Sequence, residues 1–141
     1  MSRWFQSSIE MNKRSFPTDM RIQANMEFMC CNFADRVRDC VGIPVLVTSG
    51  YRTPDYNKEI GGSKTSMHVH ALAHDLTWAG ISEKWVKKIA RHLRDAVIEC
   101  DFQFIWYADN RFIHVGLTKI GKQTEFLIKL DNGYSRFDID I

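Results

Sequence analysis

The spacing of apolar residues predicts two amphipathic helices. After Pro17 and Thr18, apolar side chains recur every three or four residues until Gly42, which is the period of a helix with one buried face. The members of this stripe are Ile22, Met26, Met29, Phe33, Val37 and Cys40. A second stripe follows Ser82, a residue type that favours the N-cap. We expect it to bury Trp85, Ile89, Leu93, Ala96 and Val97, with His92 packed beside them.

Short runs rich in β-branched and aromatic residues predict the strands. We expect a buried strand at 44–50, a second strand at 71–78, and a pair at 102–107 and 112–117 joined by a hairpin-type connection. The tail adds one or two strands around Asn132-Gly133. Residues 52–66 are polar and predict a long loop, a kind of segment that is often functional. Together these elements predict an α+β fold, a small antiparallel sheet with two main helices.

Length and charge narrow the class of protein. A chain of 141 residues with 45% hydrophobic and 26% charged residues suits a single globular domain spanning 1–141, with residues 1–17 as an N-terminal arm. A net charge of +2 gives no support for nucleic-acid binding. No run is long enough to span a bilayer, and the first residues lack the apolar core of a signal peptide. We therefore expect a monomer without a membrane partner, synthesised in the cytoplasm and delivered to any outside target by another factor.

Strand alternation separates the histidines of the run SKTSMHVHALAHD at residues 63–75. In a strand from residue 71, Asp75 shares a face with two alanines, whereas His74 shares the other face with two leucines. His68 lies just before the strand and is free to reach the Asp75 side. We expect His74 to pack in the interior or to orient a ligand, and His70 to be exposed or next to the site.

The run FIHVGL at residues 112–117 presents a further histidine. Its apolar residues form one face, while His114 lies on the other face beside Gly116, which leaves open space. His68, Asp75 and His114 thus form a set of two imidazoles and one carboxylate. Catalytic zinc takes three protein ligands of these types and keeps a fourth position for water.

The motifs around these residues resemble the zinc D-Ala-D-Ala carboxypeptidase family, in the Hedgehog/D,D-peptidase superfamily. That family combines a strand ending in Ser-Gly-Tyr-Arg, the pattern SxHxxGxAxD and a later histidine on a strand. The matching positions are Ser49, Gly50, Tyr51 and Arg52, then Ser66, His68, Ala73 and Asp75, and finally His114. The glycine of the pattern is replaced here by Ala71.

The resemblance implies a fold and an activity. His68, Asp75 and His114 would bind Zn²⁺, and the fixed guanidinium of Arg52 would stabilise the negative charge that develops on the substrate. Ser66 would position the substrate, and Tyr107 is a second candidate for this role. The substrate would be a peptidoglycan stem peptide, cleaved by a D,D-carboxypeptidase or an L-Ala-D-Glu or D,D-endopeptidase activity, as in cell wall degradation or phage lysis.

The chain departs from the family at the general base. Relatives carry Glu or Asp shortly before the last histidine or two residues after it, where this chain has Ala108, Arg111 and Gly116. Asp109 is the nearest carboxylate and the predicted base, with Tyr107 and His70 as alternatives. The departure keeps a second function open, a zinc-stabilised binding module of the same fold without catalysis.

Overall fold

The computed structural model describes residues 19–141, so the predicted N-terminal arm lies outside the described residues. The first predicted helix is confirmed as α2 (Met20–Met29), a π-helical turn (Cys30–Ala34) and α3 (Asp35–Val41), which follow one another without a break. Asp19 caps its start by accepting from the backbone N–H groups of Arg21 and Ile22. Gly42 ends it with φ 77°, a left-handed conformation that glycine adopts without strain.

Six strands form one sheet in the order β1-β2-β4-β3-β5-β6. Their bounds are β1 (Val45–Ser49), β2 (Ala73–Trp78), β3 (Phe102–Tyr107), β4 (Phe112–Leu117), β5 (Glu125–Leu130) and β6 (Gly133–Arg136). The β3–β4 and β5–β6 hairpins are confirmed. Four of the five strand pairings are antiparallel, as expected, and β3 and β5 pair in parallel. Both edges of β4 are occupied, by β2 and β3, so the chain after β4 crosses to the free edge of β3 and enters it in the parallel direction.

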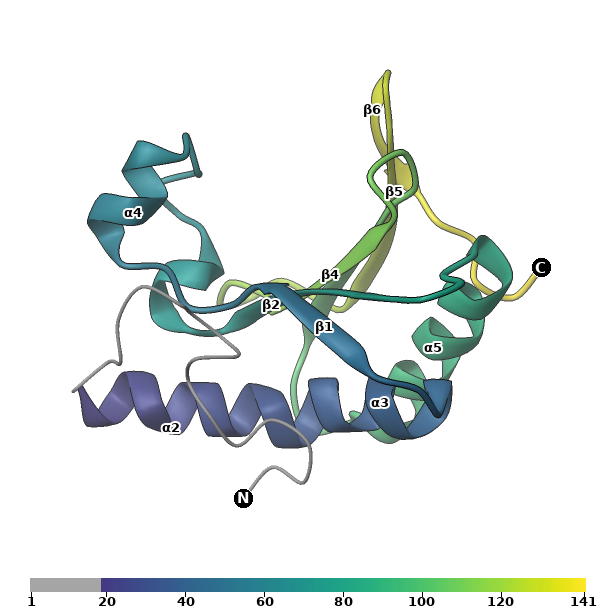
Figure 1. Cartoon of the computed structure of the whole chain (residues 1–141), viewed down its shortest axis with the longest axis horizontal. Helices are drawn as coiled ribbons and strands as arrows, with labels where there is room; N and C mark the ends of the chain where they lie inside the picture. The colour runs from purple at the N-terminus through teal and green to yellow at the C-terminus, as the bar shows by residue number, and fades with distance from the viewer. Residues whose placement is uncertain (1–18) are drawn as a thin grey trace.

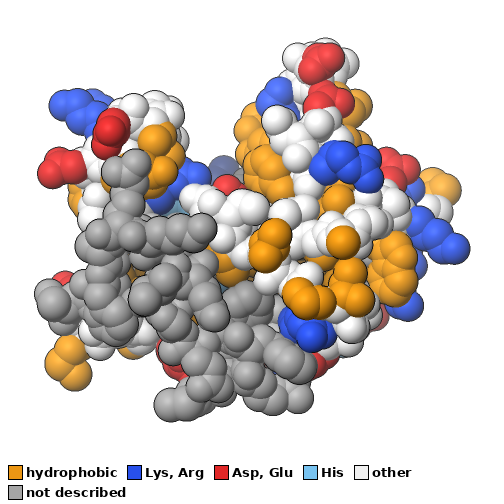
Figure 2. All heavy atoms as spheres, in the orientation of Figure 1, with side chains coloured by type: hydrophobic (Ala, Val, Ile, Leu, Met, Phe, Trp, Pro, Cys, Tyr) orange, Lys and Arg blue, Asp and Glu red, His pale blue; other side chains and the backbone are white. Residues whose placement is uncertain are grey.

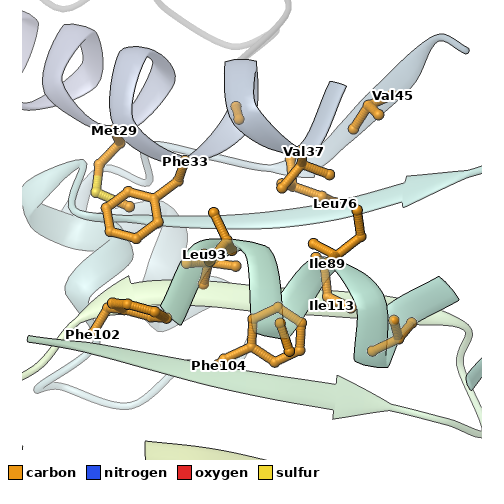
Figure 3. Close-up of a cluster of buried hydrophobic side chains, with 14 of the residues drawn as sticks. Met29, Phe33, Val37, Val45, Leu76, Ile89, Leu93, Phe102, Phe104 and Ile113 are labelled. Atoms are coloured by element: carbon orange, nitrogen blue, oxygen red, sulfur yellow. The ribbon is translucent and has the colours of Figure 1, made fainter. Parts of the chain in front are cut away.

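The two long helices cover one face of the sheet and enclose the core. The α2–α3 helix and α5 (Glu83–Ala96) pack there against side chains from β2, β3 and β4 (Figures 1 and 3). Phe33, Phe102 and Phe104 are among the largest fully buried side chains. None of the helices in the described range combines the length and the apolar character needed to cross a membrane.

The buried stripe of α5 differs from the prediction. It runs through Val86, Ile89, Ala90 and Leu93 to Val97, whereas Trp85 and His92 are exposed. The buried positions keep a strict spacing of three and four residues, and Trp85 and His92 each lie one position outside it. The Trp85 ring instead makes a cation–π contact with the Lys88 ammonium, which lies 4.6 Å from the ring centroid.

Strand β1 is an edge strand rather than the buried strand predicted. It pairs only with β2, and its side chains alternate between the core and the outside. Val45 is buried, while Leu46 is 62% exposed. The apolar run Val45–Val47 therefore indicates a high propensity to form a strand and does not indicate that the strand is buried on both faces.

The predicted loop at residues 52–66 contains a short helix, α4 (Pro54–Glu59). Thr53 caps it, accepting a hydrogen bond from the Tyr56 N–H at 3.1 Å, and Pro54 occupies the first turn. A 3₁₀ turn at Met67–His70 follows, and Ala71 leaves it with φ 58°. Strand β2 therefore begins at Ala73, two residues later than predicted. The left-handed residue gives a physical reason for glycine at this position in the family pattern.

Candidate metal centre

Three elements meet at the sheet face opposite the helices. His68 comes from the 3₁₀ turn, Asp75 from β2 and His114 from β4, and Asp75 and His114 are direct cross-strand partners. The ligand atoms of these three residues all lie within 4.8 Å of one another, and residues 19–141 contain no other cluster of three or more His, Cys, Asp or Glu side chains of this kind. The structure thus brings together the three predicted ligands.

The orientation of His68 is fixed from two sides. Ser66 caps the turn by accepting from the His68 N–H at 3.2 Å, and the ring Nδ1 lies 2.8 Å from the Gly50 carbonyl. A carbonyl only accepts, so Nδ1 carries the proton and donates it. In the neutral ring, Nε2 then has a free lone pair, and this atom lies 3.2 Å from Asp75 Oδ1.

The space for His114 comes from small neighbours. A Cβ added at Gly116 would lie 3.1 Å from His114 Nε2 and 3.1 Å from Ala73 Cβ. His114 Nδ1 meanwhile lies 2.9 Å from the same Oδ1 of Asp75 that His68 approaches. Gly116 and Ala73 therefore leave room for the imidazole beside the carboxylate.

This arrangement fits a divalent cation. A lone pair of His68 and a carboxylate oxygen of Asp75 face each other at 3.2 Å, which is stable only with a proton or a cation between them. With a proton on that His68 nitrogen and no cation present, burial would raise the pKa of Asp75, but hydrogen bonds from His114 and His68 outweigh it and hold that pKa well below its usual range. The donor set of two nitrogens and one ionised oxygen suits zinc.

Arg52 borders the same cluster. Its Nη2 lies 3.7 Å from Asp75 Oδ2, while Nε donates to Ser49 Oγ at 3.0 Å and Nη1 to Asn57 Oδ1 at 3.3 Å. Its backbone N–H donates to the His68 carbonyl at 3.0 Å. The guanidinium is thus held beside the cluster by β1, α4 and the 3₁₀ turn together.

Asn57 is a site residue that the sequence analysis did not single out. It is buried on α4, and its amide nitrogen donates to the Ser63 carbonyl at 2.9 Å while its oxygen accepts from Arg52. A Cβ added at Gly62 would lie 2.0 Å from Asn57 Oδ1, so glycine is required there. The capping pair Thr53-Pro54 and the pair Gly61-Gly62 could have indicated this helix and its tight return.

Two further predicted residues, Tyr107 and Asp109, lie outside the ligand cluster. Tyr107, on β3, has its pKa raised by burial and by its hydrogen bond with Tyr134, and the charges of Asp75 and Arg52 also act on it. Asp109 is exposed in the β3–β4 turn, where its carboxyl hydrogen-bonds Asp131, which raises its pKa. The structure does not bring Asp109 into the metal-ligand cluster.

Two other histidines take different positions. His74 is buried on the core face, as strand alternation predicts, and its Nδ1 has no hydrogen-bond partner among the described residues. Burial, followed by the charge of His68, lowers the pKa of His74 to about 3. His70 is exposed, and its carbonyl accepts from the Asn25 side chain at 2.9 Å.

The surface above the cluster is hollowed between the lobe containing α4 and the β5–β6 hairpin (Figure 2). Fold and site together define an α+β protein with a candidate centre for one divalent metal ion on an open sheet face. A family model described as Peptidase M15 matches residues 6–116, well over half of the chain. The chain belongs to this family, the zinc-dependent peptidase family that its motifs resemble. A search of curated proteins gives no significant match.

Proposed function

We propose that the protein is a zinc metallopeptidase that hydrolyses an amide bond in peptidoglycan stem peptides, as a D,D-carboxypeptidase or as an L-Ala-D-Glu or D,D-endopeptidase. Membership of the Peptidase M15 family supports the reaction class. The observation that carries the proposal is the convergence of His68, Asp75 and His114 beside Arg52 on one open face. The proposed setting is wall degradation, including phage lysis.

Each residue of the cluster has a proposed task. His68, Asp75 and His114 would hold the zinc, and His68 is oriented for this by the Gly50 carbonyl. Zinc bound there would supply an activated water at neutral pH and polarise the carbonyl of the scissile amide. Arg52 would stabilise the oxyanion, since Ser49 and Asn57 hold its guanidinium in place before substrate arrives.

Ser66 and Tyr107 are the proposed substrate-binding residues. Ser66 lies next to the 3₁₀ turn that carries His68, and its hydroxyl already accepts from that turn. Tyr107 lies beside Phe112 on the site face, with the two rings stacked at 4.5 Å. The Tyr107 hydroxyl and ring would contact the peptide flanking the scissile bond.

The proton-transfer role is assigned to Asp109, with Tyr107 and His70 as alternatives. Asp109 must move out of its hydrogen bond with Asp131, or act through an intervening water, to reach the reacting atoms. This separation favours the second candidate function, a zinc-stabilised module that binds peptide without cleaving it.

One experiment separates the two functions. Purified protein is incubated with muropeptides, with and without a chelator, and the products are identified by mass spectrometry. We expect cleavage that stops with chelator and in His114→Ala. His92→Ala is the matched control, because His92 is exposed on α5 and lies outside the cluster. One zinc per chain without any cleavage would overturn the peptidase and support the binding module.

A further inference from the structure

The strand register places a continuous row of side chains between the candidate metal centre and β6 at the far edge of the sheet. Asp75 pairs with His114, His114 with Ile105, Ile105 with Leu127 and Leu127 with Arg136. Directly paired residues of neighbouring strands lie on the same face of a sheet. All five side chains therefore belong to the face that carries the metal centre.

The composition of this row changes along its length. Ile105 is 5% exposed and Leu127 is half-buried, so the row passes over an apolar floor after His114. It ends at Arg136, which is exposed. Within residues 19–141, the Arg136 guanidinium has no hydrogen-bond or ion-pair partner. An apolar floor that ends in an unpaired guanidinium matches a ligand with an apolar body and an anionic end.

A second row of the same face runs alongside. Phe112 pairs with Tyr107, Tyr107 with Lys129 and Lys129 with Tyr134. Tyr107 stacks on Phe112 and meets Tyr134 edge to face, with ring centroids 6.2 Å apart and the two hydroxyls 3.1 Å apart. The Lys129 ammonium lies 5.4 Å from the Tyr134 ring centroid. These contacts make the second row an aromatic surface that runs alongside Ile105 and Leu127.

The charges on this part of the face leave Arg136 available for an anion. The Lys129 charge acts on Asp109, which is hydrogen-bonded to Asp131 in the neighbouring turns, and Glu125 accepts from the Gln103 amide at 2.6 Å. Figures 1 and 2 show the β5–β6 hairpin standing up beside the hollow above the metal centre. The hairpin, residues 125–136, lies beyond the segment matched by the family model.

We propose that the β5–β6 hairpin is the second half of the substrate site, and that Arg136 binds a carboxylate of the peptide whose scissile amide lies at the metal centre. The proposal rests on the proposed function for the scissile end. Three strand spacings separate β4 from β6, about 14 Å in all, which an extended peptide covers with about four residues. A guanidinium binds a carboxylate through two parallel hydrogen bonds, which makes Arg136 selective for a planar anion.

The test measures binding separately from turnover. Peptides with an uncleavable ketomethylene group at the scissile position carry either a carboxylate or a carboxamide two, three, four or five residues away. Their Kd values for the zinc-loaded protein are measured by calorimetry, in the wild type, in Arg136→Gln and in Lys84→Gln. The last variant removes the same charge from α5, where Lys84 is exposed.

We expect the carboxylate to improve binding most at about four residues, by roughly tenfold. That preference should vanish in Arg136→Gln and persist in Lys84→Gln. An equal preference in all three proteins would overturn the role of Arg136. Equal affinity of the wild type for the carboxylate and carboxamide peptides would also overturn the role of Arg136. Failure of the peptidase proposal has a different signature, since the carboxylate preference would then appear while the cleavable peptides stay intact.

Discussion

Single residues decide the geometry of the candidate metal centre, and Gly116 is the clearest case. In Gly116→Ala the new methyl would press on the His114 ring and on Ala73, each at 3.1 Å. Because His114 would have to shift by a few tenths of an ångström, we expect zinc affinity to fall about tenfold. Competition with a chromophoric chelator measures this. Gly121→Ala, which strains the backbone at φ 85° outside the ligand cluster, is the control for a general loss of stability. Unchanged affinity would show that the space beside His114 is not limiting.

The assignment of the general base is also tested at this scale. Asp109→Asn keeps the shape of the turn and removes proton transfer, so we expect kcat to fall about a hundredfold with zinc still bound. Asp131→Asn, which alters the hydrogen-bonded partner, is the control and should retain most turnover. If Asp109→Asn cleaves at a near-normal rate while Tyr107→Phe does not, the base is Tyr107.

Buried His74 makes stability depend on pH. The pKa of His74 is about 3 in the folded protein and 6.5 ordinarily. Below pH 6.5 the unfolded chain therefore binds a proton at His74, whereas the folded protein binds it only near pH 3. Stability is therefore lost as the pH falls through this window, roughly 2–3 kcal/mol by pH 4.5. In chelator, His74→Leu should lose correspondingly less between pH 7 and 4.5 in denaturant titrations. Parallel pH profiles for the two proteins would contradict this.

At the scale of elements, α4 connects the fold to the chemistry. Thr53 caps the helix that carries Asn57, and Asn57 holds Arg52. We expect Thr53→Ala to cost about 1 kcal/mol of stability and also to lower kcat/KM, because Arg52 loses its support. Ser82→Ala removes the corresponding cap of α5 and should cost similar stability without touching kcat/KM. Equal kinetic effects in both variants would mean that α4 does not position Arg52.

The elements also show what local sequence could predict. Helical periodicity located the α2–α3 helix and α5, and alternation placed His74 on the core face and His114 on the other, because those patterns depend on neighbours along the chain. Helix α4 was missed because its six residues show no apolar stripe. Whether β1 lies at the edge of the sheet depends on which strands pair with it, and the residues Val45–Val47 do not indicate this pairing.

At the scale of the whole molecule, the candidate site was more predictable than the sheet. Motif spacing identified His68, Asp75 and His114, and the fold brings them together. The parallel pairing of β3 with β5 follows from which edge the chain reaches after β4, and no residue pattern encodes that choice. The rows leading to Tyr134 and Arg136 exist only through this pairing, so they became visible only in the structure.

The central claim is that one zinc ion is held by two imidazoles and a carboxylate. X-ray absorption spectroscopy of the zinc-loaded protein measures this most directly. We expect one zinc per chain with nitrogen and oxygen ligands at about 2.0–2.1 Å, two of the ligands imidazoles, and one imidazole fewer in His114→Ala. A sulfur ligand at about 2.3 Å, or an unchanged spectrum in His114→Ala, would contradict the assignment.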